Sequence, residues 1–425
     1  MTDQETIFAL SSGRPPAGIA VIRLSGSRAH AAAAALAGAL PPAREARLRT
    51  LRASDGSVLD QALLLRFDGP ASATGEDLVE FHCHGGRAVV AAVCAALAAQ
   101  PGVREAEPGE FTRRAVVNGR IDLTEAEGLA DLLEAETEWQ RRAAVGAAEG
   151  STRRLIEDWR RRVIELSAQA EAAIDYVGDE DETALDEPAF SAAIVALADE
   201  WRVWLARPRA DLLREGVRIV LAGPPNAGKS SLFNALVGRE RAIVTEVAGT
   251  TRDALEAPIA IDGVPLVLVD TAGLRETGDQ VEAIGVERAH AQVAGAGIVL
   301  WLGAPDEAPD HSRVIKVHAQ IDRRGSPPPS SFGVSALTGE GIATLLAAVR
   351  DQAASAFPPP DLTSLNRRQA DLLAEALNAL SCVSHDIVIA AYQLRLAREA
   401  LDRITGQSST EEMLDSLFGR FCLGK

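Results

Sequence analysis

The segment Gly223-Pro224-Pro225-Asn226-Ala227-Gly228-Lys229-Ser230 constrains the fold of this chain more than any other stretch. It matches G-x-x-x-x-G-K-[ST] in the required context, after the apolar run 218–222 and before the helical pattern 231–236. Glycines let backbone N–H groups turn toward phosphates, and the N-terminus of the helix adds positive potential. Lys229 can then reach the β- and γ-phosphates, while the Ser230 hydroxyl can bind Mg²⁺. The sequence therefore predicts a nucleotide-binding α/β domain.

Two further motifs favour a switch GTPase over a generic P-loop ATPase. The apolar run 267–269 ends in Asp270, and Thr271-Ala272-Gly273 follows directly. An acid in this place can hold Mg²⁺ through water, and a glycine N–H can reach a γ-phosphate. Between the motifs, Gly249-Thr250-Thr251-Arg252-Asp253 offers the Thr251 hydroxyl as a second Mg²⁺ ligand, which would order the loop when the γ-phosphate is present. Its Arg252 and Asp253 can pair with each other or stay solvated.

The motif that should read the nucleotide base is altered. GTPases usually carry Asn-Lys-x-Asp, whose carboxylate accepts hydrogen bonds from guanine, whereas this chain has Ala319-Gln320-Ile321-Asp322. The acid is kept, and the Asn and Lys are lost. Asp322 is therefore the predicted guanine reader, supported by the loop that contains Ser335-Ala336. An ATPase is the alternative that this altered motif leaves open.

The hydrolytic water needs an unusual partner. Many GTPases orient it with a Gln after Asp-x-x-Gly, but that place is Leu274, and the nearest plausible carboxylate is Glu282. Asn226 in the phosphate loop could bind a monovalent cation that neutralises charge in the transition state. On the residues alone, an asparagine in this place more often only stabilises the loop.

Helical periodicity on both sides of the α/β domain predicts a discontinuous second domain. The first piece runs from Ile121, with Thr124 and Glu127 as a predicted capping box, to about Arg214. After the proline-rich break 357–360, helical spacing returns, and Gly406 suits the end of a long helix. Before residue 118, the runs 18–24 and 62–67 predict strands and 88–99 predicts a helix. The predicted fold class is a small α/β N-terminal domain, a discontinuous all-α domain and an inserted P-loop GTPase domain of the Ras-like α/β type. Their predicted bounds are 1–118, 119–214, 215–357 and 358–425.

Composition limits the partners and the compartment. Asp and Glu outnumber Lys and Arg by 60 to 43, and the formal net charge of −17 argues against a general nucleic-acid coat or a polybasic membrane binder. Any RNA contact must therefore be local. Four widely spaced cysteines fit neither a disulfide framework nor a zinc knuckle. Since the sequence also has no signal-peptide pattern and no apolar run of membrane-spanning length, we expect a cytoplasmic protein without membrane contact.

At this point the chain resembles the MnmE (TrmE) family of tRNA modification GTPases from end to end. The GTPase motifs carry the resemblance together with Pro108-Gly109-Glu110-Phe111-Thr112 and the terminal Phe421-Cys422-Leu423-Gly424-Lys425. The resemblance implies a homodimer formed through the N-terminal domains, with GTPase domains that pair across the dimer in potassium. It also implies an MnmG-type flavoprotein partner and addition of an aminomethyl or carboxymethylaminomethyl group to C5 of the wobble uridine, position 34, of certain tRNAs. The one-carbon cofactor would be 5-formyl- or 5,10-methylene-tetrahydrofolate, bound by the N-terminal domain.

The resemblance also implies roles for individual residues. Ser230 and Thr251 would bind Mg²⁺, and the K⁺ site would comprise Asn226, Thr245, Val247 and Thr250. The catalytic group would comprise Glu282, Lys229 and Arg275, and tetrahydrofolate would be bound by Arg23, Glu80, Arg120 and Lys425. Residues expected around GTP are Asn226, Ala227, Gly228, Lys229, Ser230, Ser231, Thr245, Glu246, Val247, Ala248, Gly249, Thr250, Thr251, Asp270, Thr271, Ala272, Gly273, Asp322, Ser335 and Ala336.

Three alternatives stay open at this point. Cys422 can take part in the modification chemistry or simply be a small buried residue. His82 and His84 share one face of a predicted strand, which suggests a metal site, but two ligands without a third favour a structural role. The function itself can be that of a potassium-stimulated GTPase in tRNA modification or that of a nucleotide-gated scaffold that binds RNA or ribosomal particles. A basic RNA-binding appendage would favour the scaffold.

Overall fold

The computed structural model describes residues 5–175, 185–239, 255–270, 291–359, 362–381, 386–408, 418, 419, 421 and 424. Internal contacts divide the chain into two units, which are described separately below. Unit 1 contains residues 1–130 and 405–425, and unit 2 contains residues 131–404. No helix among the described residues is both long and apolar enough to cross a membrane.

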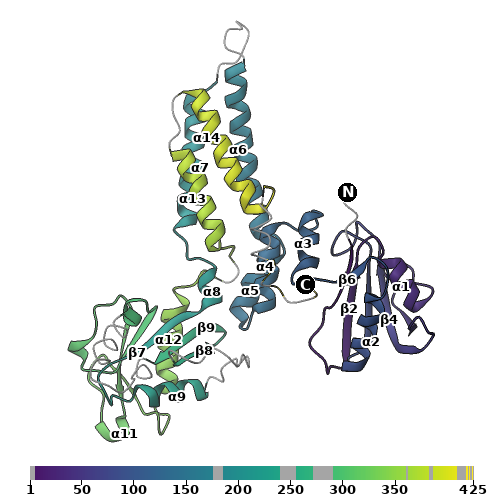
Figure 1. Cartoon of the computed structure of the whole chain (residues 1–425). Coiled ribbons are helices and arrows are strands. Elements are labelled where there is room, and N and C mark those ends of the chain that lie inside the picture. The colour runs from purple at the N-terminus through teal and green to yellow at the C-terminus, as the bar shows by residue number, and fades with distance from the viewer. Residues whose placement is uncertain are drawn as a thin grey trace, which may run out of the picture. The chain divides into compact units, whose positions relative to one another are not determined.

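Unit 1 is built on a six-stranded sheet in the order β3-β4-β5-β2-β1-β6 (Figure 1). Neighbouring strands are antiparallel, apart from the parallel pair β1 and β6. Helices α1 and α2 pack on one face of the sheet, where Ile22, Phe81 and Val93 are among the buried core residues. The strands are β1 (Thr6–Leu10), β2 (Ile19–Ser25), β3 (Arg47–Arg52), β4 (Val58–Phe67), β5 (Leu78–His84) and β6 (Val103–Glu105), and the helices are α1 (Ala29–Ala37), α2 (Arg87–Ala98) and α3 (Glu110–Val117).

Alternation along β2 decides what the other face of this sheet carries. Ala20, Ile22 and Leu24 are completely buried in the core under α1 and α2. Because successive side chains of a strand point to opposite faces, Arg23 and Ser25 lie on the opposite face. Phe111 of α3 packs on Ile7 and Ala9 of β1, whose side chains face the same way. The sequence pattern thus places a charged side chain on the same face as α3.

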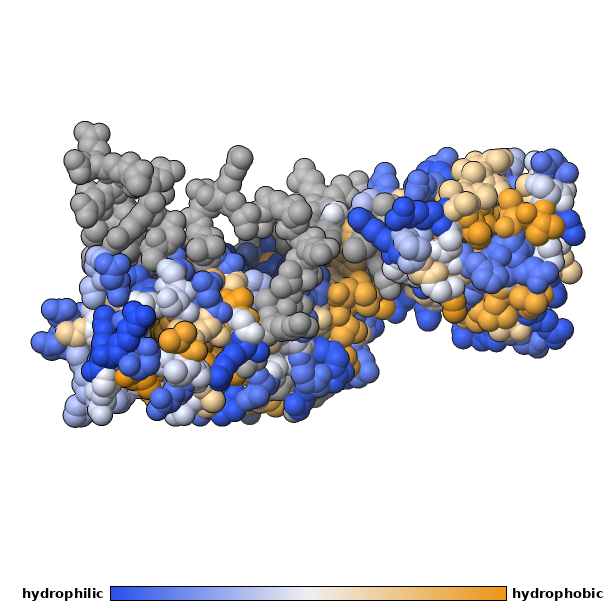
Figure 2. Space-filling view, turned by 90° about the horizontal axis from the view of Figure 1, so that it is seen from below, coloured by the Kyte–Doolittle hydropathy of each residue, from blue (hydrophilic) through white to orange (hydrophobic). Residues whose placement is uncertain are grey.

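Part of this second face is apolar and exposed. Ile19, Leu48 and Leu63 are 62%, 62% and 39% exposed, and each pairs with residues on the face opposite the α1–α2 core. Figure 2 shows one face of the molecule, on which patches of hydrophobic residues lie among hydrophilic ones. Antiparallel sheets commonly leave one face to solvent, but adjacent large apolar side chains on that face are typical of an interaction surface.

Unit 1 is completed by segments from both ends of the sequence. The helix α4 (Leu123–Glu134) contributes Leu123 and Ala126 to a small core that also contains Phe418 and Phe421. The predicted capping box Thr124/Glu127 is wrong. Asp122 accepts a hydrogen bond from the Glu125 backbone N–H at 2.8 Å, and the Glu125 carboxylate accepts one from the Asp122 N–H at 2.7 Å. Asp122 competes better because it precedes the helix, where orphan N–H groups need acceptors.

Unit 2 contains a second six-stranded sheet, in the order β12-β11-β10-β7-β9-β8. Its strands are parallel except for β8, which is antiparallel to β9. The first strand in sequence, β7, lies inside the sheet between β9 and β10, so the chain turns to opposite sides of β7 at this point. The elements are α8 (Asp211–Glu215), β7 (Val217–Ala222), α9 (Lys229–Arg239), β8 (Leu255–Ile261), β9 (Val264–Asp270), β10 (Ile298–Trp301), β11 (Val314–Ala319), α11 (Ile321–Arg324), β12 (Phe332–Val334) and α12 (Ile342–Ala354), with a 3₁₀ turn at Pro305–Glu307.

The remaining helices of unit 2 confirm the discontinuous helical domain. Helices α6 (Ser151–Asp175) and α7 (Glu187–Leu205) share one core with α13 (Arg367–Ser381) and α14 (Ile387–Thr405), and the four lie side by side in Figure 1. Trp159 is fully buried there, and its ring is edge-on to Trp201 at 6.0 Å between centroids. Helix α14 ends at Thr405, and Gly406 follows with φ +85°, as its sequence position predicts.

The tryptophans of the first helical piece do not share one core. Trp139, on α5 (Glu138–Ala148), packs against the core of the second sheet and lies edge-on to Phe357. Its backbone N–H donates to Gly263 O in the β8–β9 turn at 3.5 Å. Helical spacing shows that a face is apolar, but it does not say which neighbour covers that face.

Candidate functional site

The phosphate loop connects β7 to α9 at the carboxyl edge of the second sheet. Gly223 has φ +146°, and a Cβ there would meet the backbone of Leu302 at 3.1 Å, so any other residue at this position would be strained. Asn226 has φ +60°, a left-handed conformation that asparagine adopts more readily than most residues. This backbone conformation by itself explains an asparagine at position 226. The contact between the Asn226 side chain and a cation remains a prediction.

Lys229 opens α9 and points back over the loop. Its Nζ donates to the carbonyl oxygens of Gly223 at 2.8 Å and Pro224 at 2.9 Å, and the residue is 8% exposed. The ammonium group is therefore held where the loop backbone turns, and phosphate oxygens can compete with these carbonyls for it. Ser230 and Ser231 are exposed in the first turn of α9, and Ala227 is buried in the core.

Asp270 stands beside this loop. It ends β9 and pairs in register with Leu221 of the parallel neighbour β7, two residues before Gly223. Because parallel strands end at the same edge of a sheet, a buried carboxylate and the phosphate loop are neighbours there. The Asp270 carboxylate and the Ser230 hydroxyl supply hard oxygen donors, which are the ligands that Mg²⁺ prefers.

The altered base-reading segment keeps a rigid acid. Ser335 is completely buried after β12, and its hydroxyl donates to Asp322 Oδ1 at 2.6 Å. The Thr338 backbone N–H donates to the same hydroxyl at 3.2 Å, which leaves its single proton for Asp322. Sequence reasoning paired Asp322 with Ser335-Ala336, and the structure brings Asp322 and Ser335 into direct contact.

Gln320 is a residue that sequence reasoning treated only as a loss. It has φ +64°, and its Nε2 would lie 3.3 Å from a Cβ on Gly228, so the amide side chain lies against the phosphate loop. The sequence feature that could have indicated this contact is the position of Gln320 in the Asn-Lys-x-Asp pattern. Glutamine there keeps a long side chain in place of the lysine but carries no charge. Gln320 thus connects the base-reading segment to the phosphate loop.

Several predicted site residues lie outside the described residues. They are the loop residues Thr245, Glu246, Val247, Ala248, Gly249, Thr250 and Thr251, the residues Thr271, Ala272 and Gly273, the catalytic candidates Arg275 and Glu282, and the terminal Cys422 and Lys425.

The predicted folate residues lie in unit 1, where two of them form a pair. Arg23 on β2 and Glu80 on β5 are cross-strand partners, and their ion pair measures 2.9 Å. The Arg23 guanidinium also lies 5.8 Å from the centroid of the Phe111 ring on α3, within cation–π range. Arg120 is exposed after α3, and its stem lies against Gly75, in the loop that leads to β5.

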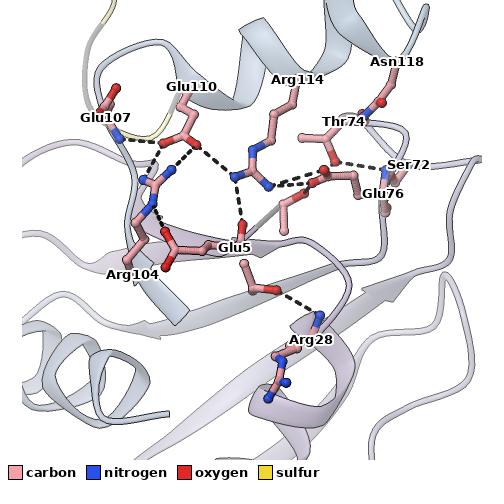
Figure 3. A network of polar contacts seen from close by, with 12 residues as sticks. Glu5, Arg28, Ser72, Thr74, Glu76, Arg104, Glu107, Glu110, Arg114 and Asn118 are labelled. Carbon is pink, nitrogen blue, oxygen red and sulfur yellow. Dashed lines mark hydrogen bonds and ion pairs between the residues drawn. The ribbon is translucent and has the colours of Figure 1, made fainter. Parts of the chain in front are cut away.

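A network of ion pairs surrounds Arg114 of α3 (Figure 3). Arg114 is almost buried and pairs with Glu110 at 2.9 Å and with Glu76 at 3.2 Å, while Arg104 pairs with Glu110 at 2.7 Å and with Glu5 at 2.9 Å. Burial alone would raise the pKa of Glu110, but hydrogen bonds from Arg104, the Glu107 N–H and Arg114 outweigh it and lower that pKa below its usual value. A chain of alternating charges thus ties α3 to Glu5 before β1, to β6 and to the loop before β5.

Each histidine of β5 lies beside a carboxylate. His84 Nδ1 is 2.7 Å from Asp60 Oδ1, and His82 Nε2 is 3.4 Å from Glu80 Oε2. Within the described ranges, the one His/Asp group close enough to suit a metal ion is elsewhere, at His30, Asp68 and Asp77. Cys83, which lies between the two histidines in sequence, is buried in the core, and burial raises the pKa of its thiol to about 12.

Comparison with known proteins covers the whole chain. The family model described as the GTP-binding protein TrmE N-terminus matches residues 6–120, and the model of the MnmE helical domain matches residues 123–422. The protein named tRNA modification GTPase MnmE from Erythrobacter litoralis is 54% identical over 99% of this chain and 100% of its own length. The proteins of the same name from Novosphingobium aromaticivorans and Zymomonas mobilis are 52% and 48% identical over 100% and 99% of this chain, each over its whole length. Among solved structures, the Era protein of Aquifex aeolicus bound to GDP·AlF4⁻ covers 40% of this chain and 68% of its own, with 23% identity and a TM-score of 0.27.

Proposed function

This chain belongs to the MnmE (TrmE) family of tRNA modification GTPases, and from that premise we propose that it is a potassium-stimulated GTPase that modifies C5 of the wobble uridine, position 34, of certain tRNAs. Membership of the family makes it a GTPase that uses GTP and Mg²⁺ in tRNA modification. One observation supports the proposal most: Lys229, the buried Asp270 and the Ser335-bound Asp322 all lie in the same sheet domain of a chain that matches the family over its full length.

In this proposal the GTPase residues divide the work on GTP. Lys229 leaves the carbonyls of Gly223 and Pro224 to bind the β- and γ-phosphates, and its charge offsets the charge that develops on the leaving β-phosphate. Ser230, Thr251 and Asp270 are the residues that would hold Mg²⁺. When bound, Mg²⁺ neutralises charge between the two phosphates. Glu282 orients the attacking water, and Arg275 belongs to the same catalytic group.

A potassium ion is proposed next to the phosphates, held by the Asn226 side chain with Thr245, Val247 and Thr250. The left-handed backbone of Asn226 in the phosphate loop is compatible with this assignment. When bound, K⁺ would supply positive charge near the transferred phosphate, where other GTPases use an arginine.

The one-carbon donor is proposed to be 5-formyl- or 5,10-methylene-tetrahydrofolate, bound in unit 1 by Arg23, Glu80, Arg120 and Lys425. The ion pair between Arg23 and Glu80 supports this, because it holds a guanidinium and a carboxylate in fixed positions on one sheet face. A guanidinium can pair with the carboxylates of the folate tail, while a carboxylate can accept from the N–H groups of the pterin ring. Cys422 is proposed to lie near the modification chemistry.

The proposed partners are a second copy of this chain, an MnmG-type flavoprotein and tRNA. The exposed Ile19, Leu48 and Leu63 on the open sheet face of unit 1 support a dimer through the N-terminal domains. Domain bounds at residues 118, 214 and 357 are proposed to separate the folate, helical and GTPase parts. Because tRNA is the substrate, the cytoplasm is the proposed place of action.

Steady-state hydrolysis by the purified protein tests the GTPase part of the proposal. GTP and ATP are compared in potassium and in sodium at matched ionic strength. GTP-selective turnover that rises in potassium supports Asp322 as guanine reader and Asn226 as cation ligand. Equal turnover in the two salts would remove the potassium mechanism, and a preference for ATP would show that the altered segment 319–322 selects a different base.

A further inference from the structure

We propose that the turn Thr74-Gly75-Glu76 and the residues that fasten it are positioning elements of the folate site, because they decide where Arg120 lies. This inference rests on the proposed binding of tetrahydrofolate by Arg23, Glu80 and Arg120. It adds residues that do not touch the cofactor themselves. They act by fixing the position of the Arg120 guanidinium, and Arg120 itself is exposed.

Gly75 is the point where Arg120 meets the turn. The glycine has φ +80°, and a Cβ on it would lie 3.2 Å from Arg120 Cγ and 2.9 Å from Asn118 Cβ. Both contacts are closer than ordinary van der Waals packing. The methylene stem of Arg120 therefore runs across the backbone of Gly75. It occupies space that the side chain of any other residue at position 75 would fill.

The turn itself is fastened from three sides. Asn118 Nδ2 donates to the carbonyl of Thr74 at 2.7 Å, from the residue that caps the end of α3. The Ser25 hydroxyl lies 2.8 Å from Glu76 Oε2 and 2.7 Å from Thr74 Oγ1. Arg114 holds the Glu76 carboxylate through an ion pair of 3.2 Å. A turn with its carbonyl, hydroxyl and carboxylate all bonded has little freedom to move, and neither has the stem that lies on it.

Helix α3 joins the two halves of the folate site into one frame. Phe111 in its first turn lies under the Arg23 guanidinium, and Arg114 one turn later holds Glu76. The chain then passes Asn118 and reaches Arg120, whose backbone N–H donates to Ala115 O at 2.8 Å. The same helix thus contacts Arg23 directly and carries Arg120 at its end. Since a misplaced binding group costs affinity steeply, this frame should set how tightly the cofactor binds.

The test uses Gly75→Ala in the full-length protein, with Gly56→Ala as the matched control. Gly56 lies in the β3–β4 turn of the same unit with φ +86°, and a Cβ there has nothing within 4 Å. Both substitutions force alanine into a left-handed conformation, so both should lower the unfolding temperature, and Gly75→Ala should lower it further because its Cβ also meets Asn118 Cβ. Binding of (6S)-5-formyltetrahydrofolate is measured by isothermal titration calorimetry. We expect Gly75→Ala to raise its Kd about tenfold and Gly56→Ala to leave it within about twofold.

A double-mutant cycle separates positioning from general destabilisation. Arg120→Ala should weaken cofactor binding, and adding Gly75→Ala to it should cause no further loss, because the displaced group is gone. Asn118→Ala provides a second, milder variant at an exposed position, with an expected rise in Kd of about threefold. It removes the bond to Thr74 without straining the backbone.

The outcomes distinguish this inference from the function on which it rests. If the unmodified protein does not bind the cofactor, or if Arg120→Ala binds it normally, the folate assignment fails. If the unmodified protein binds the cofactor and Arg120→Ala weakens that binding, but Gly75→Ala binds like Gly56→Ala, the positioning role is overturned. Equal losses from Gly75→Ala with and without Arg120 would also overturn it, since the effect would then not pass through that side chain.

Discussion

Replacement of Asp322 by Asn should change which base the GTPase domain selects. The Ser335 hydroxyl has one proton, and because it already accepts from the Thr338 N–H, that proton is directed at Asp322 Oδ1. An asparagine must therefore turn its carbonyl oxygen toward Ser335. Its NH₂ group then occupies the place of Oδ2, the oxygen that Ser335 does not bind.

The size of the effect follows from this fixed orientation. Guanine presents two donors to the acid, its N1–H and its amine, and one of them would face the new NH₂. A hydrogen bond to a charged group contributes about 1.5–3 kcal/mol, and a donor left unpaired adds its own desolvation cost. A loss of about 3 kcal/mol corresponds to a Kd for GTP raised on the order of 100-fold. Xanthine carries a carbonyl in place of the amine, so Asp322→Asn should bind xanthosine triphosphate better than the unmodified protein does.

The assay is competition of GTP, xanthosine triphosphate and ATP against a fluorescent guanine nucleotide. Ser335→Ala is the control, because it removes the orienting bond but keeps the carboxylate, and we expect it to raise the Kd for GTP about tenfold. If Asp322→Asn bound GTP within about threefold of the unmodified protein, Asp322 would not read the base. Unchanged discrimination against xanthine would lead to the same conclusion.

Three further predictions concern the cation, the ion-pair network and the buried thiol. Asn226→Ala should abolish the difference in GTP turnover between potassium and sodium while GTP still binds, and a retained potassium effect would show that the asparagine only shapes the loop. Because the pKa of Glu110 is lowered in the folded protein, its contribution to stability is present above the unfolded pKa of about 4.3 and is lost as pH falls through the folded value. Unfolding temperatures of the unmodified protein and Glu110→Gln should therefore differ at pH 7 and converge toward pH 3, and a constant difference would contradict the pairing. Burial raises the pKa of Cys83 to about 12, so N-ethylmaleimide at pH 8 should label it only after unfolding, as peptide mapping would show. Fast labelling of the folded protein would refute its burial.

Local motifs were the most predictable part of this molecule. The strand, phosphate loop and helix around Lys229 lie where the sequence places them, because the glycines and the lysine act within one turn of chain. The pairing of Asp322 with Ser335 could also be predicted, since both belong to a recurring pattern. The position of Gln320 against Gly228 could not, because it depends on a left-handed residue that nothing in the pattern specifies.

Contacts between distant segments were beyond prediction from one sequence. Arg114 and Glu76 are 38 positions apart, and charged residues of either sign are common enough that no spacing selects this pair. The same holds for Trp139, whose helix has an apolar face that either neighbouring domain could have covered. The capping box predicted for α4 was wrong for another reason. Asp122/Glu125 and Thr124/Glu127 both satisfy the capping pattern, and only the actual start of the helix decides between them.

The way unit 1 is completed has a consequence for protein synthesis. Leu123 and Ala126 are covered by Phe418 and Phe421, and a Cβ on Gly109 would overlap the carbonyl oxygen of Phe418, so the returning segment fits closely. A ribosome makes residues 405–424 only after the whole of residues 131–404. Until then, the growing chain exposes the apolar face of α4 for the entire time that the GTPase and helical segments emerge. The unit that is synthesised first is thus complete only after Phe418 and Phe421 have been made, and a chain that stops before Phe418 lacks the side chains that cover Leu123 and Ala126.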